Sequence, residues 1–134
     1  LKTNYSDPES LDAVIITHGS ITAEAIKAKQ LLALDGINTG IVLVERLMPY
    51  SDLVNDIVDV LPTGETKIIT LEQEIKAGGF GMMVMERLSK YDIMRNKKTA
   101  IIALEDTLAD KYGSSIYSSF GLDAQSIARK IKNI

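Results

Sequence analysis

The sequence predicts an α/β protein with three layers, α/β/α, around a mainly parallel sheet of about five strands. Two observations predict this fold. Short, continuous runs of β-branched and other apolar residues recur along the chain, and longer segments between them repeat apolar residues every three or four positions. Strands that are covered on both faces have such continuous apolar runs, and helices between them imply right-handed crossovers.

Composition indicates one soluble globular domain, because 46% of the 134 residues are hydrophobic and 25% are charged. The net charge of −3 gives no electrostatic basis for binding nucleic acid or an anionic membrane. No segment has the roughly 18 consecutive apolar residues of a membrane-spanning helix. The absence of cysteine excludes disulfides and thiolate metal sites and fits a reducing compartment, so we expect a cytoplasmic location.

The first predicted strand is the apolar run Ala13–Thr17, and residues 1–11 before it are expected to be a linker or an edge strand. Ser20 is expected to cap the helix that follows, because a serine hydroxyl accepts hydrogen bonds from free backbone N–H groups. Gly36 suits the left-handed position after that helix. The inward-facing residues of the helix are predicted to be Ile21, Ala25, Ala28, Leu31 and Leu32.

The next strand is predicted at Ile41–Val44, followed by a helix that Ser51 caps and Pro62 ends. This helix is expected to face the core with Val54, Ile57, Val58 and Leu61. A later strand is predicted at Thr99–Leu104. Asp123 is expected to cap a terminal helix that turns Ile127, Ala128 and Ile131 inward. Between them the pattern is weak, and short helical turns are expected at Leu108–Tyr112 and Ile116–Phe120.

The most informative stretch runs from Lys67 to Gly81, where an apolar strand leads into two acids and a glycine-rich turn. Gly78–Gly81 could cradle a phosphate with backbone N–H groups, but it matches neither G-x-G-x-x-G nor a P-loop. Glu72 and Glu74 would also repel a phosphate. We therefore expect a solvated or interface-facing acidic edge, with glycines that permit close approach of a neighbour. The apolar face of the next helix is predicted to contain Met82, Met85 and Leu88, and its methionines to be core packing or an adaptable contact surface.

No catalytic residue and no metal site are predicted. His18 follows a strand end, where active sites of such folds collect, but without a cysteine nucleophile it is expected to be an ordinary turn residue. Glu72 and Glu74 alternate along the chain, which does not suit a paired-carboxylate hydrolase, and a metal would need further ligands, such as those of Glu105-Asp106. Arg46 could hold an anion or pair with a nearby acid.

In order along the chain, four segments resemble the C-terminal domain of the transketolase family of thiamine diphosphate enzymes. They are Asp12–Ser20, Val44–Asp52, Leu71–Gly81 and Phe120–Ala128. Within that family, the Gly-Gly-Phe-Gly and Gly-Leu-Asp-Ala elements are most similar to the 1-deoxy-D-xylulose-5-phosphate synthases. Met48–Ser51 and Tyr112-Gly113 depart from the pattern of that branch, so transketolase proper and the β subunit of 2-oxoacid dehydrogenases stay open.

The resemblance implies a structural and assembly domain, over residues 12–134, of an enzyme that transfers a two-carbon unit. In this family thiamine diphosphate and magnesium are bound by other domains, so no cofactor is expected in this chain. Its expected partners are the pyrimidine and diphosphate-binding domains of a homodimeric parent. The residues expected at the interface or substrate entrance are His18, Arg46, Glu72, Glu74, Gly78, Gly79, Phe80 and Gly81.

Two alternatives remain at this stage. The chain could be a stand-alone module that binds an anion or small ligand through Gly78–Gly81 and Arg46. It could also be a subunit of a split transketolase or of a 2-oxoacid dehydrogenase, whose active site forms only with a partner chain.

Overall fold

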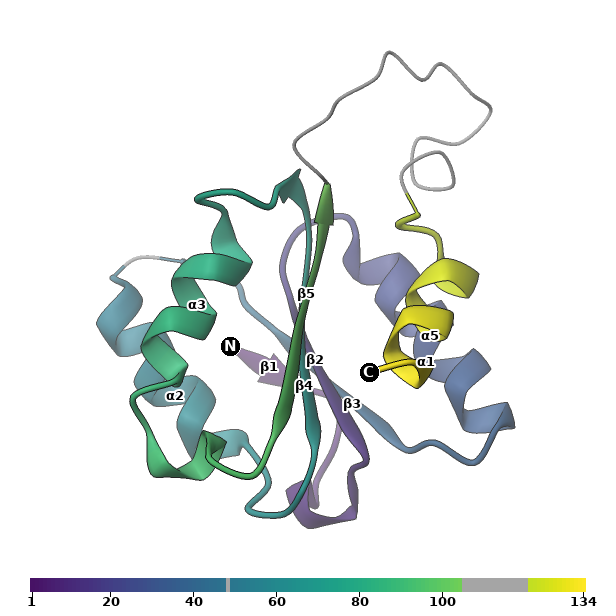
Figure 1. Ribbon diagram of the computed structural model, residues 1–134, viewed down its shortest axis with the longest axis horizontal. Helices are drawn as coiled ribbons and strands as arrows, with labels where there is room; N and C mark the ends of the chain where they lie inside the picture. Colours follow the sequence, from purple (N-terminus) through teal and green to yellow (C-terminus); the bar gives the residue numbers. More distant parts are fainter. Residues whose placement is uncertain (48, 105–120) are drawn as a thin grey trace.

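A computed structural model describes residues 1–47, 49–104 and 121–134 of the chain and contains a five-stranded sheet between two layers of helices (Figure 1). The strands are β1 (Lys2–Thr3), β2 (Ala13–Thr17), β3 (Thr39–Leu43), β4 (Lys67–Ile75) and β5 (Lys98–Leu104). The described helices are α1 (Thr22–Leu34), α2 (Tyr50–Val60), α3 (Phe80–Leu88) and α5 (Ala124–Lys132), with short 3₁₀ turns at Pro8–Ser10 and Asp92–Met94. The predicted three-layer α/β fold is confirmed.

The sheet has the strand order β1-β3-β2-β4-β5, and β2 lies at its centre. Ile15 of β2 pairs with Ile41 of β3 and with Ile69 of β4, both in parallel. At one side of the sheet, β1 pairs antiparallel with β3. The carboxyl ends of β2, β3 and β4 therefore meet along one end of the sheet, as in other open parallel sheets.

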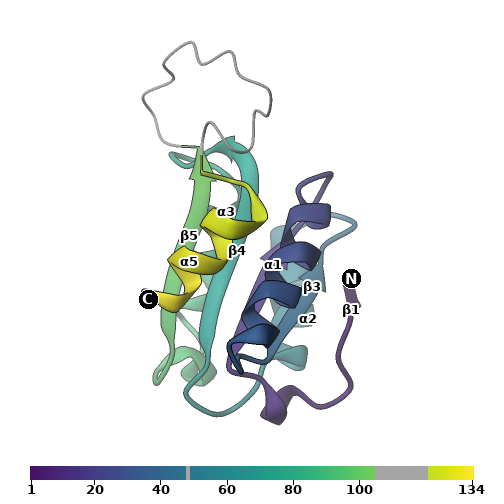
Figure 2. The same cartoon turned by 90° about the vertical axis from the view of Figure 1, so that its right-hand side faces the viewer.

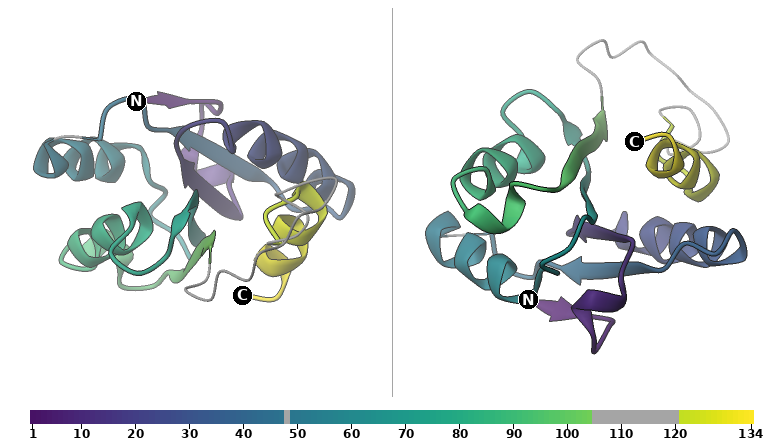
Figure 3. Two further views of the ribbon diagram at one scale, coloured as in Figure 1. Left: turned by 90° about the horizontal axis from the view of Figure 1, so that it is seen from above. Right: turned by 60° about the horizontal axis from the view of Figure 1, so that its bottom comes forward.

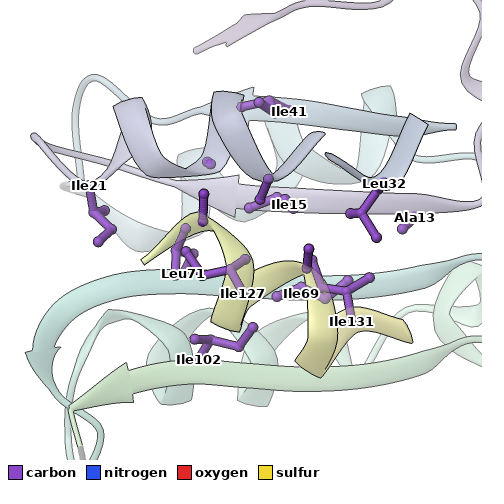
Figure 4. Packing of buried hydrophobic residues seen from close by; sticks show 14 of the residues in the cluster. Ala13, Ile15, Ile21, Leu32, Ile41, Ile69, Leu71, Ile102, Ile127 and Ile131 are labelled. Atoms are coloured by element: carbon purple, nitrogen blue, oxygen red, sulfur yellow. The ribbon is translucent and has the colours of Figure 1, made fainter. Parts of the chain in front are cut away.

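One hydrophobic core lies between the sheet and helices α1 and α5, which Figure 2 shows side by side on the same face. Because side chains alternate along a strand, Ala13 and Ile15 point to this face while Val14 and Ile16 point to the other. Figure 4 shows Ile127 and Ile131 of α5 reaching the strands. Each buried isoleucine contributes roughly 1.5–3 kcal/mol to stability.

The second core lies between the opposite face of the sheet and helices α2 and α3, and Figure 3 shows the sheet between the two helix pairs. The helices contribute Ile57 of α2 and Val84 and Leu88 of α3, all fully buried. The sheet is thus covered on both faces, which explains why its strands have continuous apolar sequences.

Three of the five predicted caps and helix-end positions are confirmed, and one of them is Pro62, which directly follows the last residues of α2. Asp123 accepts a hydrogen bond from the backbone N–H of Ser126 at the start of α5, and Gly36 has a φ of +76° after α1. The caps predicted at Ser20 and Ser51 are wrong. Helix α1 begins after Ile21, and the Ser20 hydroxyl bonds the Gln73 side chain instead. Helix α2 already begins at Tyr50, because the extended backbone of Pro49 leads directly into it, which leaves Ser51 inside the first turn.

The predicted apolar face of α3 is also wrong at Met82, which is 45% exposed. The helix begins at Phe80, and its buried face is formed by Phe80, Val84 and Leu88, four residues apart. Met82 therefore lies a half-turn away from the core. The turns predicted within Leu108–Phe120, like Glu105-Asp106, lie outside the described residues.

The Asp123 cap gives a test of the fold. We expect Asp123→Ala to lower the free energy of unfolding by about 1 kcal/mol, because the Asp123 carboxylate accepts hydrogen bonds from the backbone N–H and the hydroxyl of Ser126 at the start of α5. Gln125→Ala, at an exposed position in the first turn of the same helix, is the matched control and should change it by less than about 0.5 kcal/mol. Urea unfolding of both variants checks this, and equal losses would contradict the capping role.

Candidate functional site

The carboxyl ends of β2 and β4 bring together the residues that we call the glycine-turn site: His18, Glu72, Glu74 and Gly78–Gly81. Strand β4 is longer than predicted, since it continues through the acids to Ile75 with an irregularity in its pairing after Leu71. Thr17 of β2 pairs with Leu71 of β4, so His18 and Glu72 follow side by side. Seven of the eight predicted site residues thus lie in one site.

Glu72 is fully buried, so the expectation of a solvated acidic edge is wrong for this residue. Its Oε2 accepts a hydrogen bond from the backbone N–H of Gly81 at 2.5 Å, in the first turn of α3. Its Oε1 is buried and has no hydrogen-bond partner among the described residues. Glu74, two positions on, has a side chain that is 51% exposed and agrees with the expectation. The irregular pairing of β4 separates the environments of the two acids.

The glycines allow the turn to lie directly against Glu72 and its strand. A Cβ at Gly79 would collide with Oε1 of Glu72 and with the carbonyl oxygen of Ile75. A Cβ at Gly81 would lie 2.5 Å from the Thr70 hydroxyl oxygen. Gly78 has a φ of +71°, which favours glycine. The close approach predicted for these glycines therefore exists, and the neighbour that approaches is the chain's own strand β4.

Burial raises the pKa of Glu72 from its ordinary value of 4.5 to about 7. The hydrogen bond from Gly81 acts in the opposite direction, because it stabilises the carboxylate, and the negative charge of Glu74 adds to the increase. Loss of hydration is the dominant effect. Near neutral pH, Glu72 therefore exists in both its protonated and its ionised forms.

His18 packs against the start of α3. Its ring lies edge-on to Phe80, with ring centroids 4.7 Å apart and an interplanar angle of 69°. Its Nε2 lies 3.6 Å from Oε2 of Glu74, which is too long for a hydrogen bond. This geometry gives His18 a packing partner and a nearby carboxylate, and neither of them is a nucleophilic hydroxyl or thiol.

Arg46 is the predicted residue that the structure leaves outside the site. It lines a separate cavity of about 540 Å³. The other lining residues are Leu1, Glu45, Pro49, Asp52, Leu53 and Asp56. Three of them are acids, so this cavity does not favour an anion. Arg46 has no ion-pair partner among the described residues.

The described residues do not fit a magnesium-bound diphosphate. No three histidine, aspartate or glutamate side chains in residues 1–47, 49–104 and 121–134 are arranged to hold a metal. At the start of α3, where a phosphate would receive backbone hydrogen bonds, the Glu72 carboxylate already occupies the place of the anion.

No helix in the described part of the chain is long and apolar enough to cross a membrane.

The sequence analysis missed Thr70, which is fully buried and lies beside Gly81. Its hydroxyl has no hydrogen-bond partner among the described residues. Because side chains alternate along a strand, Thr70 and Glu72 share one face of β4, and this alternation was the signal that could have identified it. The exposed fractions of Ile75 (40%) and Met82 (45%) add apolar surface around the turn.

Comparison with known proteins gives a consistent family. The model of the family described as "Transketolase, C-terminal domain" matches residues 3–127. A 1-deoxy-D-xylulose-5-phosphate synthase of Chlorobium phaeovibrioides is 36% identical over 128 residues, which are 92% of this chain and 19% of that protein. The chain therefore spans about a fifth of the length of this relative.

Solved structures share the fold. A split-gene transketolase, solved as an inactive tetramer of four β subunits, matches with a TM-score of 0.73 and 21% identity, over 98% of this chain and 41% of that chain. A transketolase of Pichia stipitis in complex with sedoheptulose 7-phosphate matches with a TM-score of 0.63 and 20% identity, over 98% of this chain and 17% of that chain.

The raised pKa of Glu72 predicts how stability depends on pH. Between pH 4.5 and about 7 the folded chain keeps a proton that the unfolded chain has lost, so the free energy of unfolding should fall as pH rises through this interval. The fall attributable to Glu72 should reach roughly 3 kcal/mol, since one pKa unit corresponds to about 1.4 kcal/mol. Glu72→Gln should remove this component.

Urea unfolding of both proteins at closely spaced pH values checks this expectation. Glu9 and Asp123 have lowered pKa values, so their contribution to stability is lost below this interval and does not obscure it. An identical slope in the wild type and in Glu72→Gln would contradict the assignment.

The glycine turn gives a second test. Gly79→Ala should lower the free energy of unfolding by about 1–3 kcal/mol, because the added methyl group meets Glu72 and a backbone carbonyl. Gly64→Ala is the control, since a Cβ at Gly64 meets open space. If thermal unfolding shows the two variants to be equally stable, the turn does not press against Glu72 as described.

Proposed function

The chain belongs to the transketolase C-terminal domain family, and from this membership we propose that it is the structural and assembly domain of a larger thiamine diphosphate-dependent transferase. The parent would transfer a two-carbon unit and would act as a 1-deoxy-D-xylulose-5-phosphate synthase. The relative of that name, at 36% identity, supports this assignment. Because the chain spans 19% of that relative, the activity belongs to the whole parent.

The observation that carries this role is that Glu72 fills the anion position at the start of α3. A phosphate or cofactor diphosphate would have to displace a buried carboxylate of the chain itself. The glycine-turn site therefore offers a closed surface with exposed apolar side chains at Ile75 and Met82. Such a surface suits packing against another protein domain. We propose that the pyrimidine and diphosphate-binding domains of the parent are its partners and hold thiamine diphosphate and magnesium.

The same observation argues against a stand-alone anion-binding module, since the N–H of Gly81 is already bonded and Arg46 lies among acids. A subunit of a split enzyme is the second candidate. The similarity in fold to the split-gene transketolase, at a TM-score of 0.73, favours it over the module. The proposed parent or assembly is cytoplasmic and homodimeric, in line with the family resemblance.

A chimera tests the proposal. The matching segment of the Chlorobium phaeovibrioides synthase is replaced by this chain, and synthase activity is measured with added thiamine diphosphate and magnesium. We expect an active enzyme. Met82→Asp, at the glycine-turn site, should lower activity at least about tenfold, because a charge enters the apolar contact. Leu34→Asp, on the exposed outer face of α1, should leave it within about twofold.

Two results would refute the assembly role. One is an equal effect of Met82→Asp and Leu34→Asp in the folded chimera. The other is tight, stoichiometric binding of thiamine diphosphate by the isolated chain in calorimetry.

A further inference from the structure

Two buried oxygen atoms at the glycine-turn site lack hydrogen-bond partners among the described residues: Oε1 of Glu72 and Oγ1 of Thr70. Both belong to the same face of β4 and lie under the turn that leads into α3. An unsatisfied buried oxygen destabilises the fold, and it does so more strongly when it carries charge. A fully ionised Glu72 beneath a closed turn is therefore an unfavourable state.

The packing of the turn restricts what can satisfy Oε1. Gly79 lies so close that even an added methyl group would collide with Oε1 and with the carbonyl oxygen of Ile75. Oε1 is also buried from solvent, so bulk water does not reach it while the turn is closed. A proton fits without moving any heavy atom. It removes the negative charge, so that the carboxyl group no longer needs the hydration that the closed turn denies it.

The charged side chains near Glu72 do not supply a hydrogen-bond or ion-pair partner for its carboxylate. On β4, Glu74 has the same sign of charge as an ionised Glu72 and raises its pKa. From the end of β2, His18 faces Glu74 at 3.6 Å and packs on Phe80. The first turn of α3 contains no acidic or basic residue, and Ile101 of β5 approaches Gly81 with a methyl group. No basic side chain pairs with Glu72 in the described part of the chain, and residues 105–120 lie outside it.

We propose that Glu72 is a proton latch of the glycine-turn site: the protonated carboxyl group keeps Gly78–Gly81 closed, and its ionisation opens the turn. The O–H bond breaks, the proton passes to water, and the carboxylate then needs hydration that the closed turn excludes. Opening displaces Phe80, which begins α3 and contacts His18. The surface offered to a partner therefore changes with the proton. This consequence for assembly rests on the function proposed above, whereas the latch is a property of this chain alone.

Nuclear magnetic resonance of the ¹⁵N- and ¹³C-labelled full chain tests the latch between pH 5 and 8.5. The side-chain carboxyl carbon of Glu72 should titrate with a midpoint near 7, and the Gly81 amide should follow the same curve. In Glu72→Gln the pH-dependent change in the chemical shift of the Gly81 amide, here called the Gly81 step, should vanish. In Glu74→Gln it should persist at a lower midpoint, because a neighbouring negative charge is removed. A Glu72 midpoint near the ordinary 4.5, or a Gly81 step that survives in Glu72→Gln, would overturn the proposal.

A further variant separates the carboxyl group from the imidazole, because histidine side chains as a class titrate in the same range. The Gly81 step should remain in His18→Gln. Its loss there would assign the titration to His18 and overturn the latch. The carboxyl carbon of Glu72 in the wild type reports ionisation directly, so the test stands even if Glu72→Gln does not fold.

Hydrogen exchange measures the opening itself. Between pH 6 and 8, amides from Gly79 to Met82 should lose about tenfold in protection beyond the intrinsic effect of pH, and in Glu72→Gln protection should stay constant. Constant protection in the wild type would overturn the proposal. Failure of the chimera together with an intact Glu72 titration would refute the assembly role and leave the latch, whereas an active chimera with no titration would refute the latch alone.

Discussion

The structure of the glycine-turn site depends on one hydrogen bond, from the backbone N–H of Gly81 to the buried carboxyl group of Glu72. This bond joins strand β4 to the first turn of α3 and satisfies one of the free N–H groups of that turn. Close approach of the turn follows from it, and so does the requirement for glycine at 79 and 81. The same bond fixes the start of α3 at Phe80, which places that ring against His18.

Other open parallel sheets use the carboxyl ends of their strands to bind ligands in a crevice. In this chain an internal side chain occupies the position at which a helix start would otherwise hold a phosphate. The chain thus supplies its own hydrogen-bond acceptor at this helix start, in the place where other proteins of this kind bind an external anion. The helix start therefore links α3 to strand β4 and does not offer a site to a ligand, which is consistent with a domain that packs against others.

The sequence was sufficient for the fold, because strands covered on both faces, such as Ala13–Thr17, have an unbroken apolar pattern. It also identified the residues that the structure brings together in the glycine-turn site, since strand ends and glycines are local signals. It was not sufficient for the burial of Glu72, because two acids separated by one residue look equivalent until the irregular pairing of β4 is known. Ser20 and Ser51 failed as predicted caps for a similar reason: helix starts here are set by the preceding backbone and by tertiary contacts.

The short strand β1 has a consequence for handling this domain. Lys2–Thr3 pairs with β3, Asn4 accepts a hydrogen bond from the Ile41 N–H at 2.7 Å, and the Tyr5 hydroxyl bonds the Val60 carbonyl. These contacts cover the outer backbone of β3. A fragment that began at Asp12 would leave backbone N–H and C=O groups of β3 unpaired at the edge of the sheet, and such edges can pair with the strands of other molecules and lead to aggregation. Residues 2–5 thus protect the edge of the sheet, and we expect a domain that lacks them to be less soluble.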